Sequence, residues 1–170
     1  MRTGSWTPVT VFFSGRDRER KLEIMKDSRV GSNGVVGFVF LTLLKWQLIA
    51  HVNPTILLQF LFFMPIISRY SLVLSIRLFH YARPEGMGKA FAVYSPKQTL
   101  LWTTLIALLP AVYFHWLYAI FLGLGILINL VLNSYISKHL GGVTGDTYGF
   151  VIESSELLLV LAAVAVGITL

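Results

Sequence analysis

Five long apolar runs constrain this chain more than any other feature. They cover residues 34–52, 55–76, 99–115, 117–136 and 148–170, and each approaches the ~20 residues that a helix needs to cross a bilayer. Of the 170 residues, 55% are hydrophobic and only 13% are charged, whereas soluble domains carry about 25% charged residues. We therefore predict an all-α fold. It is a polytopic integral membrane helix bundle of about five transmembrane helices, formed by residues 34–170 and preceded by a cytoplasmic segment at 1–33.

The distribution of Lys and Arg predicts the orientation of these runs. Basic residues precede the first run and lie in the connections between runs two and three and between runs four and five, whereas the other two connections carry none. By the positive-inside rule, the basic side is cytoplasmic and the C-terminus lies outside. All acidic residues fall on the basic side, which favours a shared cytoplasmic site: Asp17, Glu19, Glu23, Asp27, Glu85, Asp146, Glu153 and Glu156.

Net charge and cysteine content narrow the possible partners. The net charge of +6 suits the anionic headgroups of a lipid bilayer or an anionic substrate. No basic face lies outside the membrane-proximal loops, so we expect no nucleic-acid partner. The chain contains no cysteine, which excludes disulfides and thiolate metal sites.

The first of two polar islands in the sequence runs from Arg16 to Gly34, directly before the first apolar run. Glu23 and Asp27 are four residues apart, so on a helix they share one face and could hold a divalent cation through oxygen ligands. The alternative is a solvated amphipathic helix with Glu/Lys pairs, because carboxylates at this spacing are common.

The second polar island runs from Gly141 to Glu156, within a glycine-rich acidic loop at 138–156 that we place in the cytoplasm. If a helix begins near Asp146, then Glu153 and Glu156 lie inside the start of an apolar span, where carboxylates are costly and usually functional. The glycine-rich turn before the helix offers backbone N–H groups for a phosphate. The alternative is helix capping by Thr144 or Asp146, which explains Asp146 well but not the two glutamates.

Two cations lie inside apolar runs. Arg69, in the second run, is as well explained by snorkelling to the membrane surface as by contact with a phosphate. Lys45, in the first run, must pair with an acidic residue or snorkel, and the sequence does not choose its partner. The four histidines show no metal-ligand spacing and are expected at the membrane interface.

Taken together, the two islands resemble the adenosylcobinamide-GDP ribazoletransferase (cobalamin synthase) family. The similarity rests on E-R-K-L-E-I-M-K-D-S-R-V-G-S-N-G near the start and G-G-V-T-G-D-T-Y-G-F-V-I-E-S-S-E near the end, with L-L-K-W, P-I-I-S-R-Y and Y-A-R-P-E-G-M-G-K-A-F between them. It covers roughly residues 12–170. The combination is specific, although each piece alone is modest.

The resemblance implies phosphoryl-group transfer in a bacterial or archaeal cytoplasmic membrane, by a multi-pass protein that needs Mg²⁺. The 3′-hydroxyl of alpha-ribazole, or of its 5′-phosphate, would attack the cobinamide-bearing phosphorus of adenosylcobinamide-GDP and release GMP. Such transfers need cationic groups on the diphosphate and little covalent chemistry. The expected catalytic residues are Asp27, Arg29 and Asp146, the expected substrate-binding residues are Lys26, Arg69, Gly142, Thr144 and Gly145, and the expected metal ligands are Glu23, Asp27, Asp146, Glu153 and Glu156.

The start of the chain departs from the family pattern. The family carries an acidic signature, H-x-D-G-L-x-D-x-x-D-G, where this chain has M-R-T-G-S-W-T-P-V-T-V. Reading the codons of that stretch one base earlier, with permissive codon choices, gives H-A-D-G-L-L-D-T-C-D-G-V. We therefore expect that the start is a frameshifted reading of a longer gene, and that the chain as printed is an impaired transferase. Sequencing the locus in the neighbouring frame tests this expectation.

Two other functions remain open on the sequence alone. A membrane phosphotransferase of the CDP-alcohol class also pairs an acid–glycine element with a later D-x-x-x-D, which the Glu23–Asp27 spacing imitates. A non-enzymatic membrane protein, such as a transporter subunit or a scaffold, is the second alternative. Transport pathways usually place ionisable groups at mid-bilayer, so acids gathered on one side argue against it.

Overall fold

Helices account for almost all of the described chain in the computed structural model, which describes residues 17–25 and 32–169. The helices are α2 (Arg18–Met25), α3 (Ser32–Ile49), α4 (Pro54–Leu78), α5 (Met87–Tyr94), α6 (Thr99–Leu140) and α7 (Gly145–Thr169). The described residues contain no strand beyond one isolated bridge between Tyr81 and Val143. The predicted all-α membrane helix bundle is therefore confirmed.

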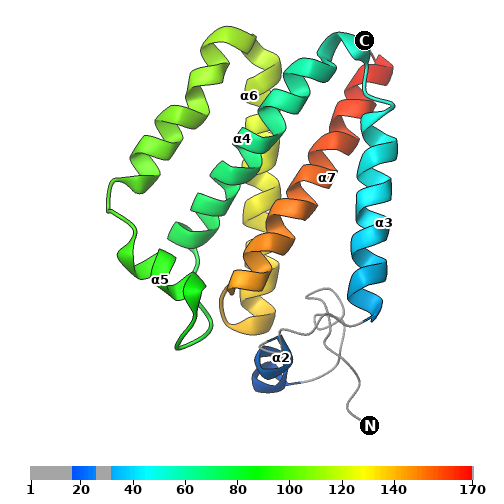
Figure 1. Ribbon diagram of the computed structural model, residues 1–170. Coiled ribbons are helices and arrows are strands. Elements are labelled where there is room, and N and C mark those ends of the chain that lie inside the picture. The colour runs from blue at the N-terminus through cyan, green and yellow to red at the C-terminus, as the bar shows by residue number, and fades with distance from the viewer. Residues whose placement is uncertain (1–16, 26–31, 170) are drawn as a thin grey trace.

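The long helices run up and down between two ends of the bundle, as Figure 1 shows. α4 descends to the end where α2, α5 and the turn at 141–144 gather, and α7 rises from that same end. We call this end, formed by α2, residues 79–94 and residues 138–146, the polar end. The opposite end holds the connection between α3 and α4 and a sharp reversal within α6.

Three helical segments are long and apolar enough to cross a membrane: Pro54–Leu78, Trp116–Leu140 and Gly145–Gly167. They correspond to the second, fourth and fifth predicted runs. The other two, Gly34–Ile49 and Thr99–Tyr113, are apolar helices in the 10–17-residue range. A helix rises 1.5 Å per residue, so these two are shorter than a straight crossing of a ~30 Å hydrocarbon layer.

The predicted third and fourth runs form the two arms of α6. α6 extends from Thr99 to Leu140 and contains Pro110. Its ribbon reverses direction at the opposite end of the bundle (Figure 1). The hydroxyl of Tyr118, a fully buried residue in the second arm, donates to the carbonyl of Ala107 in the first. This bond joins the two arms across the bend.

The main core lies between α4, α6 and α7, and aromatic side chains fill it. Phe63 of α4 meets Tyr118 of α6 edge to face at 4.9 Å between ring centroids, and Phe60 meets Phe121 at 5.5 Å. Such pairs contribute about 0.5–1.5 kcal/mol beyond the area they bury. A second cluster of buried apolar side chains lies at the polar end, where Met25 of α2 belongs to the same cluster as residues of α6 and α7.

A buried polar contact joins α4 to α6 and was not predicted. The side-chain amide of Asn129 donates to the carbonyl of Ser71 (2.7 Å) and to the hydroxyl of Ser75 (2.8 Å). Asn133 donates to the same Ser75 hydroxyl (2.9 Å). Interhelical hydrogen bonds of this kind contribute ~0.6 kcal/mol each on average in membranes.

Candidate functional site at the polar end

The turn before α7 is docked onto the loop that follows α4. The amide of Val143 donates to the carbonyl of His80, and the amide of Ala82 donates to the carbonyl of Val143, both at 2.8 Å. Gly142 has a φ of 148°, and a Cβ at this position would collide with the His80 carbonyl oxygen. The glycine therefore allows two distant segments to approach closely.

Replacing Gly142 with alanine should destabilise the fold by about 1–3 kcal/mol, because the substitution combines backbone strain with a collision against a backbone oxygen. Gly145→Ala is the matched control, since nothing lies within 4 Å of a Cβ there. Unfolding of the purified protein in mixed micelles measures both variants. Equal effects of the two substitutions would contradict the docking role of Gly142.

The start of α7 is capped by two threonines. The amide of Thr147 donates to the Thr144 hydroxyl (3.3 Å), and the amide of Thr144 donates to the Thr147 hydroxyl (2.8 Å). Both residues are fully buried. Of the two cap residues left open by the sequence, Thr144 therefore has this role, and the side chain of Asp146 is available for other contacts.

The predicted phosphate cradle is largely occupied by bonds within the protein. The amide of Gly141 donates to the Ser137 carbonyl, the amide of Val143 to His80, and the amide of Thr144 to Thr147. A phosphate at this turn would have to displace these bonds. The glycine-rich turn thus holds the local fold together, while Gly145 remains sterically open.

Asp146 pairs with a cation that sequence analysis did not assign to the site. Nη2 of Arg83 donates to Oδ2 of Asp146 at 2.9 Å. The Arg83 side chain is mostly buried, whereas that of Asp146 is 46% exposed. The pair places a solvent-accessible carboxylate in the first turn of α7 and an arginine beside it. Arg83 is one of the basic residues between the second and third apolar runs, and no local sequence pattern links it to a residue 63 positions away.

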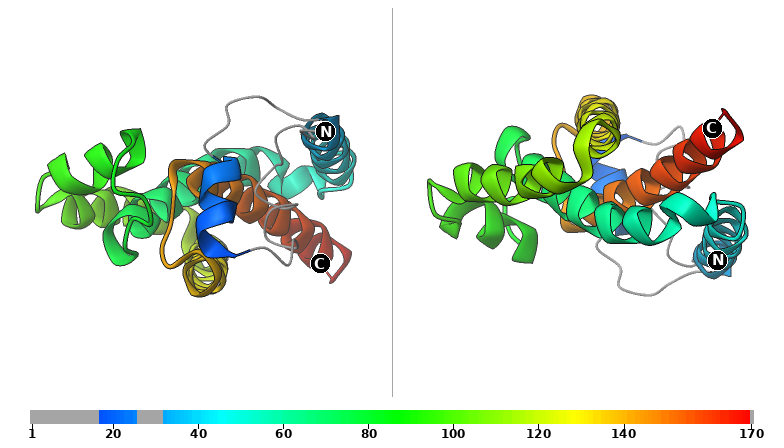
Figure 2. Two further views of the ribbon diagram at one scale, coloured as in Figure 1. Left: turned by 90° about the horizontal axis from the view of Figure 1, so that it is seen from below. Right: turned by 90° about the horizontal axis from the view of Figure 1, so that it is seen from above.

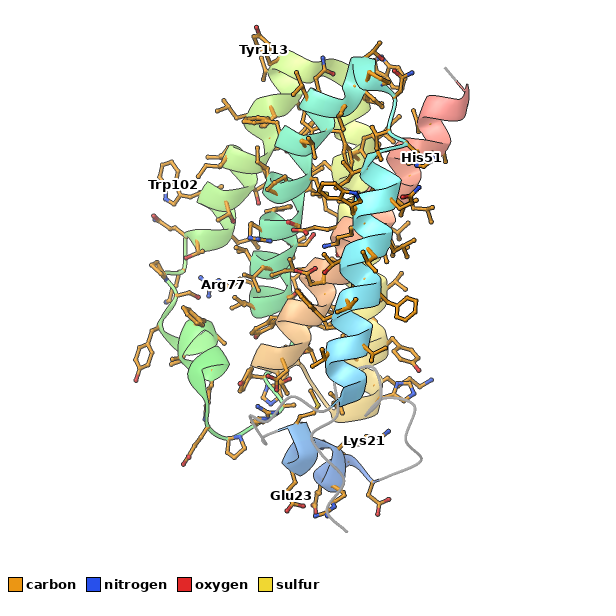
Figure 3. All side chains as sticks on the ribbon, turned by 45° about the vertical axis from the view of Figure 1, so that its right-hand side comes forward. Lys21, Glu23, His51, Arg77, Trp102 and Tyr113 are labelled. Carbon is orange, nitrogen blue, oxygen red and sulfur yellow. The ribbon has the colours of Figure 1, made fainter. Side chains whose placement is uncertain are left out.

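The first island reaches the second island at the polar end. Nε of Arg18, at the start of α2, donates to the carbonyl of Leu140 at 2.7 Å, and the guanidinium lies over Gly141. In Figure 3, the labelled Glu23 lies on the side of α2 away from the bundle, where it pairs with Arg20. The predicted site residues Lys26, Asp27 and Arg29 lie outside the described residues.

The described carboxylates do not form the predicted metal centre by themselves. Within residues 17–25 and 32–169, no group of three or more His, Asp or Glu side chains is placed to hold a metal ion. Glu23 pairs with Arg20 and Asp146 with Arg83, while Glu153 and Glu156 lie further along α7. Among the described residues there is therefore no preformed cluster of metal ligands, and the predicted ligand set stays a prediction.

Glu153 and Glu156 instead belong to a charged network inside the bundle, which we call the charge cluster. Nζ of Lys45 in α3 donates to Glu153 (2.7 Å) and to Glu156 (2.9 Å). Glu156 also accepts hydrogen bonds from Ser68 (2.9 Å) and Arg69 (3.2 Å) in α4. The charge cluster thus consists of Lys45, Ser68, Arg69, Glu153 and Glu156 from three helices.

The charge cluster identifies partners for the two cations that lie inside apolar runs. Lys45 pairs with acidic residues, as one of its two predicted alternatives required, and its partners are now identified. Arg69 makes its described contacts with Ser68 and Glu156. Glu153 and Glu156 follow Gly145 by 8 and 11 residues, which places them about 12 and 16 Å along the helix axis. Both carboxylates therefore lie along α7 beyond the polar end.

The fold and these sites define an all-α integral membrane protein with a charged, partly exposed site at one end. The model of the cobalamin-5-phosphate synthase family matches residues 10–164. The chain therefore belongs to this family.

Curated relatives of this chain carry the name adenosylcobinamide-GDP ribazoletransferase. The protein of Thermoanaerobacter sp. (strain X514) is 35% identical over 160 residues, covering 92% of this chain and 64% of the relative. That of Caldanaerobacter subterraneus subsp. tengcongensis is 35% identical over 149 residues, covering 86% and 60%. That of Desulfitobacterium hafniense (strain Y51) is 36% identical over 156 residues, covering 88% and 61%. The chain thus spans less than two thirds of the length of these relatives, and no solved structure matches it.

Proposed function

We propose that this chain carries the site of an adenosylcobinamide-GDP ribazoletransferase. The observation that carries the proposal is the meeting of the two polar islands at one end of the bundle, through Arg18 and Leu140, in a chain of this family. A diphosphate substrate needs cations and a carboxylate within reach of one another. The polar end offers both, with Arg83 beside Asp146.

In the proposed reaction, the 3′-hydroxyl of alpha-ribazole, or of its 5′-phosphate, attacks the cobinamide-bearing phosphorus. The new O–P bond forms as the bond to the leaving GMP breaks, and the Asp146 carboxylate accepts the hydroxyl proton. Arg83 is placed to orient that carboxylate and to offer its guanidinium to the diphosphate oxygens. Magnesium and the roles of Lys26, Asp27 and Arg29 remain predictions from the family resemblance.

We infer that the protein is a multi-pass protein of the cytoplasmic membrane, with the polar end in the cytoplasm. The loop cations Arg83 and Lys89 belong to the polar end, which supports this orientation through the positive-inside rule. His51, in the connection between α3 and α4, is labelled at the opposite end in Figure 3.

Cysteine labelling should place Glu85 and His51 on opposite sides of the membrane. The chain has no native cysteine, so Glu85→Cys and His51→Cys each introduce a single thiol at an exposed position. In intact cells, an impermeant maleimide should label only His51→Cys. In inverted vesicles it should label only Glu85→Cys. Labelling of Glu85→Cys from outside the cell would reverse the assigned orientation.

Reconstituted vesicles test the reaction itself. The purified chain is supplied with adenosylcobinamide-GDP, alpha-ribazole and Mg²⁺, and GMP and the corrinoid product are separated by chromatography. We expect slow release of GMP in equal amounts to the joined corrinoid, above that of heat-inactivated protein. GMP release without a joined corrinoid would indicate hydrolysis and contradict the transferase assignment.

A further inference from the structure

α3 is the most weakly packed long helix of the bundle. The exposed apolar side chains between residues 35 and 44 are Val35, Val36, Phe38, Val39, Phe40, Leu43 and Leu44. Successive helix positions are 100° apart, so these side chains leave one sector of the helix surface uncovered, and that sector holds Gly34, Leu41 and Lys45. Below Lys45, therefore, α3 packs through one narrow face alone, on which Gly34 is buried and Leu41 is partly buried. The views of Figure 2 agree that α3 lies at the periphery of the bundle.

The apolar contacts of α3 with the main core lie near the opposite end. Leu48 and Ile49 join the main core there. Between this contact and the polar end, Lys45 forms the described side-chain hydrogen bonds from α3 to α7, and its side chain is 14% exposed. Its partners Glu153 and Glu156 both lie on α7.

The ion pairs of Lys45 are strong candidates for holding α3 in place. An ion pair in an apolar, water-poor environment is much less screened than one at an aqueous surface. Helices in a bilayer also gain little from apolar burial against each other, because lipid tails are equally apolar. A single cation shared by two carboxylates one turn apart defines both the height and the rotation of α3 along α7. Buried polar groups are best known for this kind of registry role.

We propose that Lys45 is a positioning residue whose ion pairs with Glu153 and Glu156 set the placement of α3 against α7. α3 begins in the last residues of the first polar island, and α7 begins within the second. The charge cluster therefore connects the two helices that lead into the two halves of the proposed site. This functional consequence, but not the positioning itself, rests on the proposed transferase function.

Distances between spin labels test the placement of α3 directly. The cysteine-free chain allows labels at Phe38→Cys in α3 and Leu158→Cys in α7, both exposed positions outside the charge cluster. A second pair, Leu58→Cys in α4 with Leu158→Cys, reports on the rest of the bundle. We expect Lys45→Gln to broaden the α3–α7 distance distribution and to leave the α4–α7 distribution narrow.

Three further variants separate positioning from a general effect on folding. Trp46→Ala, at the exposed neighbour of Lys45, should leave both distributions narrow, and so should Arg69→Gln, because Lys45 keeps both carboxylates. The exchange Lys45→Glu with Glu153→Lys should restore a narrow α3–α7 distribution, because Glu156 retains Ser68 and Arg69. An unchanged distribution in Lys45→Gln would overturn the proposal. Broadening of both distances would also overturn it, by showing a general folding role.

Binding of adenosylcobinamide-GDP to the same variants tests the functional consequence. We expect the dissociation constant to rise about tenfold in Lys45→Gln, as for a misplaced binding group, and to recover in the charge exchange. Unchanged binding despite a broadened α3–α7 distance would separate α3 from the site and contradict the functional consequence, but not the positioning of α3 by Lys45. If the unsubstituted chain does not bind this substrate, the proposed function fails, whereas the label distances still decide how α3 is held.

Discussion

Glu156→Ala is expected to lower the free energy of unfolding by about 3 kcal/mol, because it removes the carboxylate that receives hydrogen bonds from Lys45, Ser68 and Arg69. Lys45 would keep Glu153, but Arg69 would lose the carboxylate with which it pairs. The Glu156 side chain is 13% exposed. In the alanine variant, water therefore does not readily replace the lost carboxylate as a hydrogen-bond acceptor for these three residues. Unfolding in mixed micelles, followed by tryptophan fluorescence, measures the change.

Glu85→Ala provides the control for this substitution, since Glu85 is an exposed acid in a loop at the polar end. It should change the free energy of unfolding by less than about 0.5 kcal/mol. If Glu156→Ala were as mild as Glu85→Ala, the charge cluster would not contribute to the stability of the bundle.

Asp146→Asn is expected to slow the release of GMP by at least about 100-fold, the lower range for loss of a general base. The amide is nearly isosteric with the carboxylate, but it carries no charge and cannot take up the hydroxyl proton. Stability should change by no more than about 1 kcal/mol, because the Arg83–Asp146 pair is partly exposed. The vesicle assay and the unfolding assay, applied to the same preparation, separate the two effects.

Glu85→Gln is the matched control for chemistry at the polar end and should keep the rate of the unsubstituted chain. A proportional loss of rate and of folded protein in Asp146→Asn would assign Asp146 a structural role.

The membrane runs could be predicted because the bilayer imposes their length and composition. α4, the second arm of α6, and α7 follow the apolar runs closely, since each must fill the hydrocarbon layer. Less was predictable where the membrane does not dictate length. α5 is a short helix in a loop, and the docking of residues 80–82 onto Val143 depends on backbone groups rather than on side-chain type.

The gathering of both polar islands at one end was also predictable. Each apolar run moves the chain to the other end, so the positions of loop charges determine which segments lie together. This reasoning holds even though the third and fourth runs form the two arms of one bent helix, α6. The hydrogen bond from Arg18 to the carbonyl of Leu140 is the contact that brings the two islands together.

The pairing of individual charges could not be predicted, because it depends on how each helix is rotated. Lys45 needed an acidic partner, but several carboxylates were available, and only the rotation of α3 and α7 brings Glu153 and Glu156 to it. The same holds for Arg83 and Asp146, which come from a loop and a helix start. The glycine-rich turn resembled an anion site, yet three of its amides donate to protein oxygens.

The central claim is that the polar end recognises adenosylcobinamide-GDP rather than another nucleotide-linked substrate. Competition binding to the purified chain tests it most directly, with adenosylcobinamide-GDP as the ligand, a CDP-linked lipid as competitor and Asp146→Asn as the reference variant. The account predicts saturable binding of adenosylcobinamide-GDP that excess CDP-linked lipid does not displace and that Asp146→Asn weakens. Preferential binding of the CDP-linked lipid would contradict it and assign the site to the CDP-alcohol class of phosphotransferases.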